Sequence, residues 1–212
     1  MKIYLGDLGH YTVKLTNNHT PIGIGFIAAY LKKNLQNHAE IRLFKNPDLL
    51  IDAIESSPPD VLGLSNYIWC QSISEEVLQF YKKTKPDGVA VWGGPNFPMT
   101  EPLKAKQYLL DRPYIDFYIP FEGEIPAVNI VKTVVDTNKS VRQLKRDQPD
   151  SFEGSYFISE QGELVGKNIG VQLKDINEIP SPYLEGFLDP FLAEGLHAKF
   201  ETQMGCPYHC TF

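Results

Sequence analysis

Short apolar runs along the chain alternate five times with longer segments whose apolar positions recur at helical spacing. The apolar runs, which we predict to be strands, fall at residues 2–8, 40–44, 58–65, 89–94 and 114–121. The periodic segments, which we predict to be helices, fall at residues 21–36, 47–57, 72–85, 101–110 and 124–136. Strands and helices that alternate in this way are typical of a parallel sheet covered by helices on both faces. The pattern therefore predicts an α/β fold with a doubly wound, flavodoxin- or Rossmann-like, five-stranded parallel sheet.

The remainder of the chain loses this rhythm. Residues 137–150 are polar and predict a linker, and residues 155–168 predict a hairpin around the turn-forming Gly162. Three prolines make residues 175–190 an extended connector, and residues 199–203 predict one last strand. We therefore expect a first domain over residues 1–138, a linker with the hairpin and connector over 139–196, and the start of a second domain over 197–212.

Composition and charge exclude several classes of protein. The net charge of −6 argues against a general nucleic-acid or membrane-surface binder, which would carry a basic patch. No apolar run approaches the roughly 20 residues that span a bilayer, and there is no apolar leader at the start. Three cysteines are too few for a disulfide framework. We therefore expect a soluble, cytoplasmic protein that has neither a nucleic-acid nor a membrane partner.

The carboxyl ends of the predicted parallel strands are the expected binding edge. The segments that follow the strands there are residues 7–11, 65–70, 93–97 and 121–124. Gly93 and Gly94 would let a ligand approach the backbone closely, and Ser65 offers a hydroxyl group. A tight turn at the two glycines, and helix capping by Glu122 and Glu124, explain these residues equally well without a ligand.

Two glycines in the first predicted helix match part of a dinucleotide-binding fingerprint, Gly23-x-Gly25-x-x-Ala28. That fingerprint needs its glycines in the tight turn directly after a strand, and here a long loop intervenes. We therefore favour close packing of this helix against the sheet over dinucleotide binding.

The chain closes with two cysteines at C-x3-C spacing, Cys206 and Cys210, within the octet GCPYHCTF. Cysteine thiolates hold iron–sulfur clusters, and a loop after a strand can present several of them to one cluster. The alternatives are two ordinary thiols, or half of a zinc site completed by His209. Cys70 lies far away in the sequence, and we expect it to be a small buried residue rather than a ligand.

The cysteine segment, with Glu201 and Thr202 before it, resembles the radical S-adenosylmethionine (SAM) motif, C-x3-C-x-aromatic-C. The resemblance implies that Cys206 and Cys210 bind a [4Fe–4S] cluster, that SAM binds the free iron, and that Phe212 lies near its adenine. The third cysteine of the motif would be residue 213. Met204 departs from the pattern, since the family very often has arginine there.

The preceding α/β segment resembles the cobalamin-binding domain that precedes the radical SAM barrel in one class of these enzymes. Five stretches carry the resemblance, and no one of them is specific alone: Pro21-x-Gly23-x-Gly25, Gly63-Leu64-Ser65, Trp92-Gly93-Gly94-Pro95, Glu122-Gly123-Glu124 and the connector Ile179-Pro180-Ser181-Pro182-Tyr183. The resemblance implies cobalamin-binding roles for the following residues: Gly23, Gly25, Ser65, Gly93, Gly94, Pro95, Glu122, Gly123 and Glu124.

The lower cobalt ligand is the weakest part of the resemblance. Many cobalamin domains carry Asp-x-His-x-x-Gly after the first strand, whereas here His10 stands three residues after Asp7 and no glycine follows in place. We therefore do not assign His10 as a ligand. Tyr67 and Trp69 are either neighbours of the corrin face or packing residues.

Together these resemblances imply the N-terminal part of a cobalamin-dependent radical SAM enzyme that transfers a methyl group to an unactivated carbon. They also imply an electron donor such as flavodoxin or ferredoxin, and leave the substrate undefined. The alternatives are a non-catalytic cobalamin-binding module, or another doubly wound ligand-binding domain with a structural metal at the cysteines. Only one barrel strand and two cluster cysteines are present, so we expect the chain by itself to be inactive.

Overall fold

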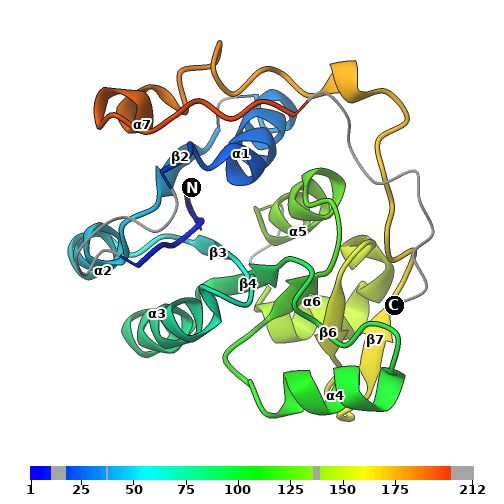
Figure 1. Cartoon of the computed structure of the whole chain (residues 1–212). Coiled ribbons are helices and arrows are strands. Elements are labelled where there is room, and N and C mark those ends of the chain that lie inside the picture. Colours follow the sequence, from blue (N-terminus) through cyan, green and yellow to red (C-terminus); the bar gives the residue numbers. More distant parts are fainter. Residues whose placement is uncertain (11–17, 37, 136–138, 202–212) are drawn as a thin grey trace.

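A computed structural model of the chain describes residues 1–10, 18–36, 38–135 and 139–201 (Figure 1). Its strands form one seven-stranded sheet in the order β2-β1-β3-β4-β5-β6-β7. The strands are β1 (Lys2–Gly6), β2 (Glu40–Phe44), β3 (Val61–Ser65), β4 (Val89–Gly93), β5 (Phe117–Ile119), β6 (Tyr156–Ile158) and β7 (Leu164–Gly166). The helices are α1 (Ile22–Asn34), α2 (Pro47–Ser56), α3 (Gln71–Thr84), α4 (Pro102–Leu110), α5 (Glu124–Val135), α6 (Val141–Asp147) and α7 (Asp189–Ala193), with short 3₁₀ turns η1 (Pro149–Phe152) and η2 (Ile176–Glu178).

The five predicted strands pair in parallel in the order β2-β1-β3-β4-β5, which is the flavodoxin-like arrangement. The register places Leu5 opposite Gly63, and Gly63 opposite Val91. All five carboxyl ends therefore meet at one edge of the sheet. The doubly wound α/β fold predicted from the sequence is confirmed.

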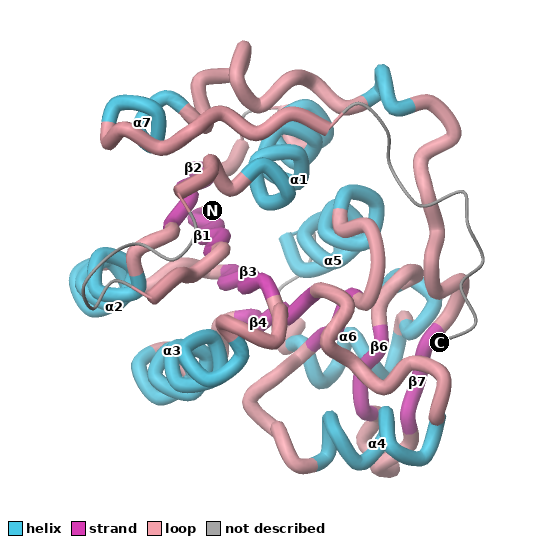
Figure 2. Tube along the Cα trace, in the orientation of Figure 1, coloured by secondary structure: helices cyan, strands magenta, loops and turns pink. Residues whose placement is uncertain are grey.

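Helices cover both faces of this sheet, with α1 and α5 on one side and α2 and α3 on the other (Figure 2). Because successive side chains of a strand point to opposite faces, alternate strand residues enter separate cores. The core under α2, α3 and α4 receives Tyr4, Leu62, Leu64, Trp92 and Tyr118 from the strands, and the core under α1, α5 and α6 receives Ile3, Leu5, Val61, Val91 and Phe117.

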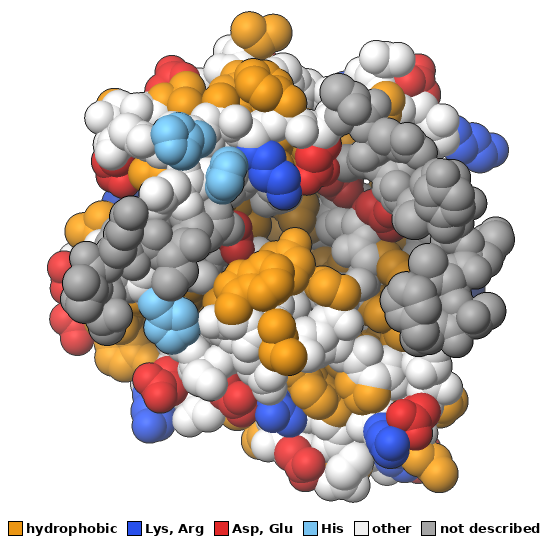
Figure 3. Space-filling model, viewed as in Figure 1, with side chains coloured by type: hydrophobic (Ala, Val, Ile, Leu, Met, Phe, Trp, Pro, Cys, Tyr) orange, Lys and Arg blue, Asp and Glu red, His pale blue; other side chains and the backbone are white. Residues whose placement is uncertain are grey.

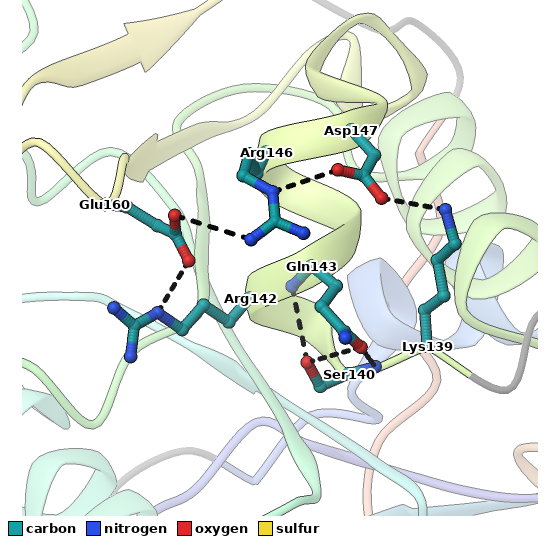
Figure 4. Close-up of polar contacts among 7 residues, drawn as sticks. All are labelled: Lys139, Ser140, Arg142, Gln143, Arg146, Asp147 and Glu160. Carbon is teal, nitrogen blue, oxygen red and sulfur yellow. Dashed lines mark hydrogen bonds and ion pairs between the residues drawn. The ribbon is translucent and has the colours of Figure 1, made fainter.

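Within the segment predicted as a linker, residues 137–150, the described residues 139–150 form helix α6 and the start of the turn η1 instead of irregular chain. Helix α6 begins with a capping box, in which the Ser140 hydroxyl accepts from the Gln143 backbone N–H and the Gln143 side chain accepts from the Ser140 N–H at 2.9 Å (Figure 4). Arg142 and Arg146 pair with Glu160 of the hairpin turn. A single apolar side chain, Leu144, packs fully buried in the core.

The predicted hairpin forms, but it belongs to the sheet rather than to a separate linker. Strand β6 pairs antiparallel with β5 through Tyr156 opposite Tyr118, and β7 pairs with β6. The sheet therefore has seven strands instead of the five predicted. The hairpin covers the edge of β5, which would otherwise present unpaired backbone groups.

The strand predicted at residues 199–203 is absent over Lys199–Glu201, and residues 202–203 lie outside the described part of the chain. The chain there makes a single bridge, between His197 and His19. The connector before it is less extended than predicted, because η2 and α7 form within it. None of the helices in the described ranges is both long and apolar enough to cross a membrane.

The burial of Leu144 gives a test of whether α6 is part of the domain. Leu144→Ala should lower the free energy of unfolding by about 2–5 kcal/mol, since it removes a fully buried side chain. Leu103→Ala is the matched control, because Leu103 is 84% exposed and its truncation should cost less than about 0.5 kcal/mol. Urea denaturation of both variants measures this, and equal stabilities would contradict the packing of α6.

Candidate functional site

A cavity of about 660 Å³ lies between one face of the sheet and helices α1 and α5, and opens at the carboxyl edge of the strands. Its walls are apolar at depth. The sheet side is lined by Ile3, Leu5, Val61, Gly63 and Val91, and the helix side by Ile24, Ile27, Leu31, Ala127, Ile130 and Val131. Figure 3 shows a hollow on this face, with hydrophobic side chains below it and charged side chains above it.

Gly63, in the middle of β3, lies at the centre of the cavity wall. It is flanked in register by Leu5 and Val91, which both line the cavity. A Cβ atom at position 63 would lie 2.8 Å from the Leu5 Cδ2 atom. A glycine within a strand weakens the strand and often marks close approach by a ligand or another chain segment. The missing side chain therefore lets Leu5 lie against β3, and backbone of β3 lines the cavity at this point.

The turn after β4 brings backbone groups to the mouth of the cavity. Gly94 has a φ of +128°, and a Cβ atom there would lie 2.6 Å from the Asn66 carbonyl oxygen. Only glycine fits this position without strain. Gly93, Gly94 and Pro95 all line the cavity, as does Ser65 at the end of β3.

A buried hydrogen-bond network holds the loops after β3 and β4 together. The Asn66 side-chain amide is fully buried and donates to the Tyr118 hydroxyl at 2.9 Å and to the Asn96 carbonyl at 3.0 Å. The Tyr118 hydroxyl in turn donates to the Gly94 carbonyl at 2.9 Å. Buried networks in which each member is satisfied make loops rigid. The mouth of the cavity is thus formed before any ligand binds.

Two aromatic side chains form part of the mouth. The rings of Tyr67 and Trp69 stack with centroids 4.8 Å apart and planes 3° from parallel, and Trp69 is 56% exposed. Buried Cys70 supports this loop, since its sulfur accepts from the Tyr67 N–H at 3.4 Å. The prediction that Cys70 is a small buried residue is confirmed. The His10 ring contacts the Trp69 carbonyl at 3.0 Å, and His10 does not line the cavity.

Charged side chains at the mouth are unusually buried. Burial raises the pKa of the Asp7 carboxyl above its ordinary value, although the nearby ammonium groups of Lys45 and Lys199 oppose this. Burial likewise lowers the pKa of Lys45, and the Asp7 carboxylate opposes that shift. The charge of each group therefore partly offsets the pKa shift that burial causes in the other, in a region from which water is largely excluded.

Three glutamates gather on the β5 side of the mouth. Glu124, the first residue of α5, is 5% exposed, and burial raises the pKa of its carboxyl to about 7. Backbone N–H groups of Gly123 and Glu124 oppose the shift, while the carboxylates of Glu122 and Glu201 add to it. Glu122 accepts from the Gln172 amide at 2.9 Å through one oxygen, and its other oxygen is buried without a partner among the described residues.

The structure brings together eight of the nine residues that the resemblance assigned to cobalamin. Those that line the cavity are Gly23, Ser65, Gly93, Gly94, Pro95, Glu122, Gly123 and Glu124. Gly25 is not among them, because its missing side chain makes room for the connector, with Pro182 Cβ 3.1 Å and Leu188 Cδ2 3.3 Å from an added Cβ. The close packing of this helix against the sheet is confirmed, since Ile24, Ala28 and Leu31 share a core with the strands, while Gly25 itself meets the connector.

Three predicted site residues, Cys206, Cys210 and Phe212, lie outside the described residues. Within the described ranges, no group of three or more His, Cys, Asp or Glu side chains is placed to hold a metal ion. Sequence reasoning missed Lys199 and Glu201, which line the mouth. The sequence places both in the last predicted strand, and no local pattern indicates that this segment reaches the cavity.

Comparisons with known proteins agree with the resemblance. The chain is 27% identical over its whole length to the cobalamin-dependent radical SAM methyltransferase TokK of Streptomyces tokunonensis, and covers 30% of it. Over 91% of its length it is 28% identical to 2-(S-pantetheinyl)-carbapenam-3-carboxylate methyltransferase of Streptantibioticus cattleyicolor, covering 28% of that protein. It is also 23% identical, over 94% of its length, to the anaerobic magnesium-protoporphyrin IX monomethyl ester cyclase of Rubrivivax gelatinosus, covering 35% of it.

The predicted resemblance to cobalamin-dependent radical SAM enzymes is confirmed by these relatives. No family model matches the chain. The chain spans about a third of the length of the curated relatives it matches.

The raised pKa of Glu124 predicts a pH dependence of stability. Because the folded protein holds this proton up to about pH 7 while the unfolded chain releases it near pH 4.5, stability falls as the pH rises through that window. Above about pH 7 the loss in the free energy of unfolding reaches about 3 kcal/mol. Glu124→Gln removes the charge, so the stability of this variant relative to the wild type should rise between about pH 5 and about pH 8.

Denaturation midpoints and free energies of unfolding at the two pH values measure this difference. Glu55→Gln is the control, because Glu55 is exposed on α2 across the sheet, and its difference from the wild type should not change with pH. If Glu124→Gln and wild type respond identically to pH, the Glu124 carboxyl is not held protonated by burial.

Proposed function

We propose that this chain is the cobalamin-binding part of a cobalamin-dependent radical SAM enzyme, one that transfers a methyl group to an unactivated carbon. The observation that carries the proposal is the cavity at the carboxyl edge, whose lining includes the glycine-containing stretches on which the resemblance rests. The methyltransferase names of two relatives support the reaction class.

The volume of the cavity suits one part of a larger ligand. This volume of about 660 Å³ falls in the range of about 300–1,000 Å³ that is usual for drug-sized ligands, and a whole corrinoid is larger than that. We propose that the nucleotide tail enters the cavity past Gly63, where the sheet lacks a side chain. The corrin ring would then lie outside, over the carboxyl ends of the strands.

The residues at the mouth fit such a ligand chemically. The stacked pair Tyr67 and Trp69 offers an apolar surface beside the opening, and the Ser65 hydroxyl and the backbone of Gly93 and Gly94 offer hydrogen bonds. The buried, unpartnered oxygen of Glu122 requires a donor that no described residue supplies.

Bound cobalamin would supply a cobalt centre able to carry a methyl group, and the chain's own residues would bind and orient it. Cys206 and Cys210, outside the described residues, would contribute two of the thiolates of a [4Fe–4S] cluster at which SAM binds. By this proposal the described residues of the chain bind and orient the cofactor.

Gly23 offers a direct test of cobalamin binding. It lines the cavity, and an added Cβ atom at this position would meet nothing within 4 Å. Gly23→Phe should therefore fill the entrance and lower the affinity for hydroxocobalamin by at least about tenfold. The fold should be kept, since replacing a helical glycine is stabilising or neutral.

The measurement is the visible absorbance of the corrin that stays with the protein after free ligand is removed. Leu103→Phe is the control, because Leu103 is 84% exposed on α4 and does not line the cavity. If the unmodified chain retains no corrin absorbance, the proposed function is wrong. If Gly23→Phe retains as much as the wild type, the ligand binds elsewhere.

A further inference from the structure

Glu122 and Glu124 are placed where a ligand in the cavity would meet them. Both follow β5 directly, both line the cavity, and Glu124 is almost completely buried. Gln172 occupies one oxygen of Glu122 and fixes the orientation of its carboxyl group, while the other oxygen is buried and has no partner in the described part of the chain.

An unpaired buried acceptor is costly, and each such group in a native structure requires an explanation. A ligand that donates an N–H or O–H group to this oxygen would remove the cost. The cavity mouth therefore requires a hydrogen-bond donor at this point, in addition to the apolar contacts that its walls provide.

The charge around the mouth determines which donors are suitable. Four carboxyl groups line the cavity, from Asp7, Glu122, Glu124 and Glu201. Lys199 is the single lysine or arginine among the described lining residues, and it already pairs with Glu201 at 3.4 Å. An anionic group on a ligand at this mouth would thus meet a surplus of carboxylates where water is largely excluded, which is strongly unfavourable.

A primary carboxamide fits this pair well. It donates through N–H and accepts through its carbonyl oxygen, while the unpartnered Glu122 oxygen offers an acceptor and the buried Glu124 carboxyl, whose pKa is raised to about 7, offers a donor when protonated. The rim of the corrin ring in cobalamin carries primary carboxamides, whereas incompletely amidated corrinoids carry carboxylates at the same positions.

We propose that Glu122 and Glu124 form a carboxyl pair that recognises a primary carboxamide on the corrin rim, so that the site selects amidated corrinoids over their carboxylate counterparts. This inference rests on the proposed binding of cobalamin and adds a specificity-determining role for the two glutamates. In this arrangement the unpartnered Glu122 oxygen accepts a hydrogen bond from the amide N–H. The buried Glu124 carboxyl donates to the carbonyl oxygen of the same amide.

The test compares hydroxocobalamin with its separate b-, d- and e-monocarboxylic acids, each of which changes one amide to an acid and keeps the nucleotide tail. Affinities for the full chain are measured by equilibrium dialysis with absorbance detection. We expect at least one monoacid to bind about 10- to 100-fold more weakly than hydroxocobalamin, because it loses a charged hydrogen bond and gains repulsion.

Glu122→Gln and Glu124→Gln should each reduce that discrimination to within about threefold, because a glutamine amide can donate to the ligand carboxylate. Glu55→Gln, across the sheet, should discriminate as the wild type does. Circular dichroism checks that each variant is folded, and the comparison of ligands on the unmodified chain needs no variant at all.

Equal affinity of the wild type for hydroxocobalamin and all three monoacids would overturn this inference and leave the proposed function standing. Discrimination that persists unchanged in both glutamine variants would also overturn this inference and leave the proposed function standing. Failure of the unmodified chain to bind hydroxocobalamin would overturn the proposed function and this inference together.

Discussion

Burial of both faces of the sheet is the constraint on which the rest of the structure depends. Helices α1 and α5 cover one face and α2 and α3 the other, so a ligand can reach the sheet at the carboxyl edge or where the cover is incomplete. Gly63 contributes no side chain between Leu5 and Val91, so that the cavity wall there is partly backbone. The cavity is a local gap in an otherwise continuous core, and it opens at the edge where parallel sheets commonly bind ligands.

The loops at that edge are held in place from below rather than by a ligand. Asn66 and Tyr118 lie fully buried beneath the mouth and connect the ends of β3, β4 and β5 through hydrogen bonds to the Gly94 and Asn96 carbonyls. Ordering these loops therefore costs little at the moment of binding, and preorganised sites gain affinity in this way. The side chains that face the cavity are therefore free to contact a ligand, because other residues support the backbone of these loops.

The sequence predicted the elements whose signals are local and missed those that depend on distant partners. The five buried strands are short, strongly apolar runs, and seven of the eight predicted residues that line the cavity lie in the segments expected to follow them, whereas Gly23, in α1, came from the family resemblance alone. Helix α6 was missed because Leu144 is its one buried apolar side chain, although the capping pair Ser140 and Gln143 was a readable signal. The partner of Gly25, Pro182, and the place of Lys199 at the mouth depend on how the connector folds back, which no local pattern encodes.

That return of the connector ties the end of the described chain to the cavity. Buried Thr20 and the Tyr183 hydroxyl contact each other at 2.8 Å, and both accept from the Lys199 N–H, at 3.1 Å and 3.0 Å. Tyr183 also donates to the Lys199 carbonyl at 2.7 Å. Because Thr20 lies two residues before α1, which forms one wall of the cavity, these hydrogen bonds place Lys199 and Glu201 at the mouth. The same carboxylate of Glu201 helps to keep Glu124 protonated, so the connector takes part in the electrostatics of the site as well as in its shape.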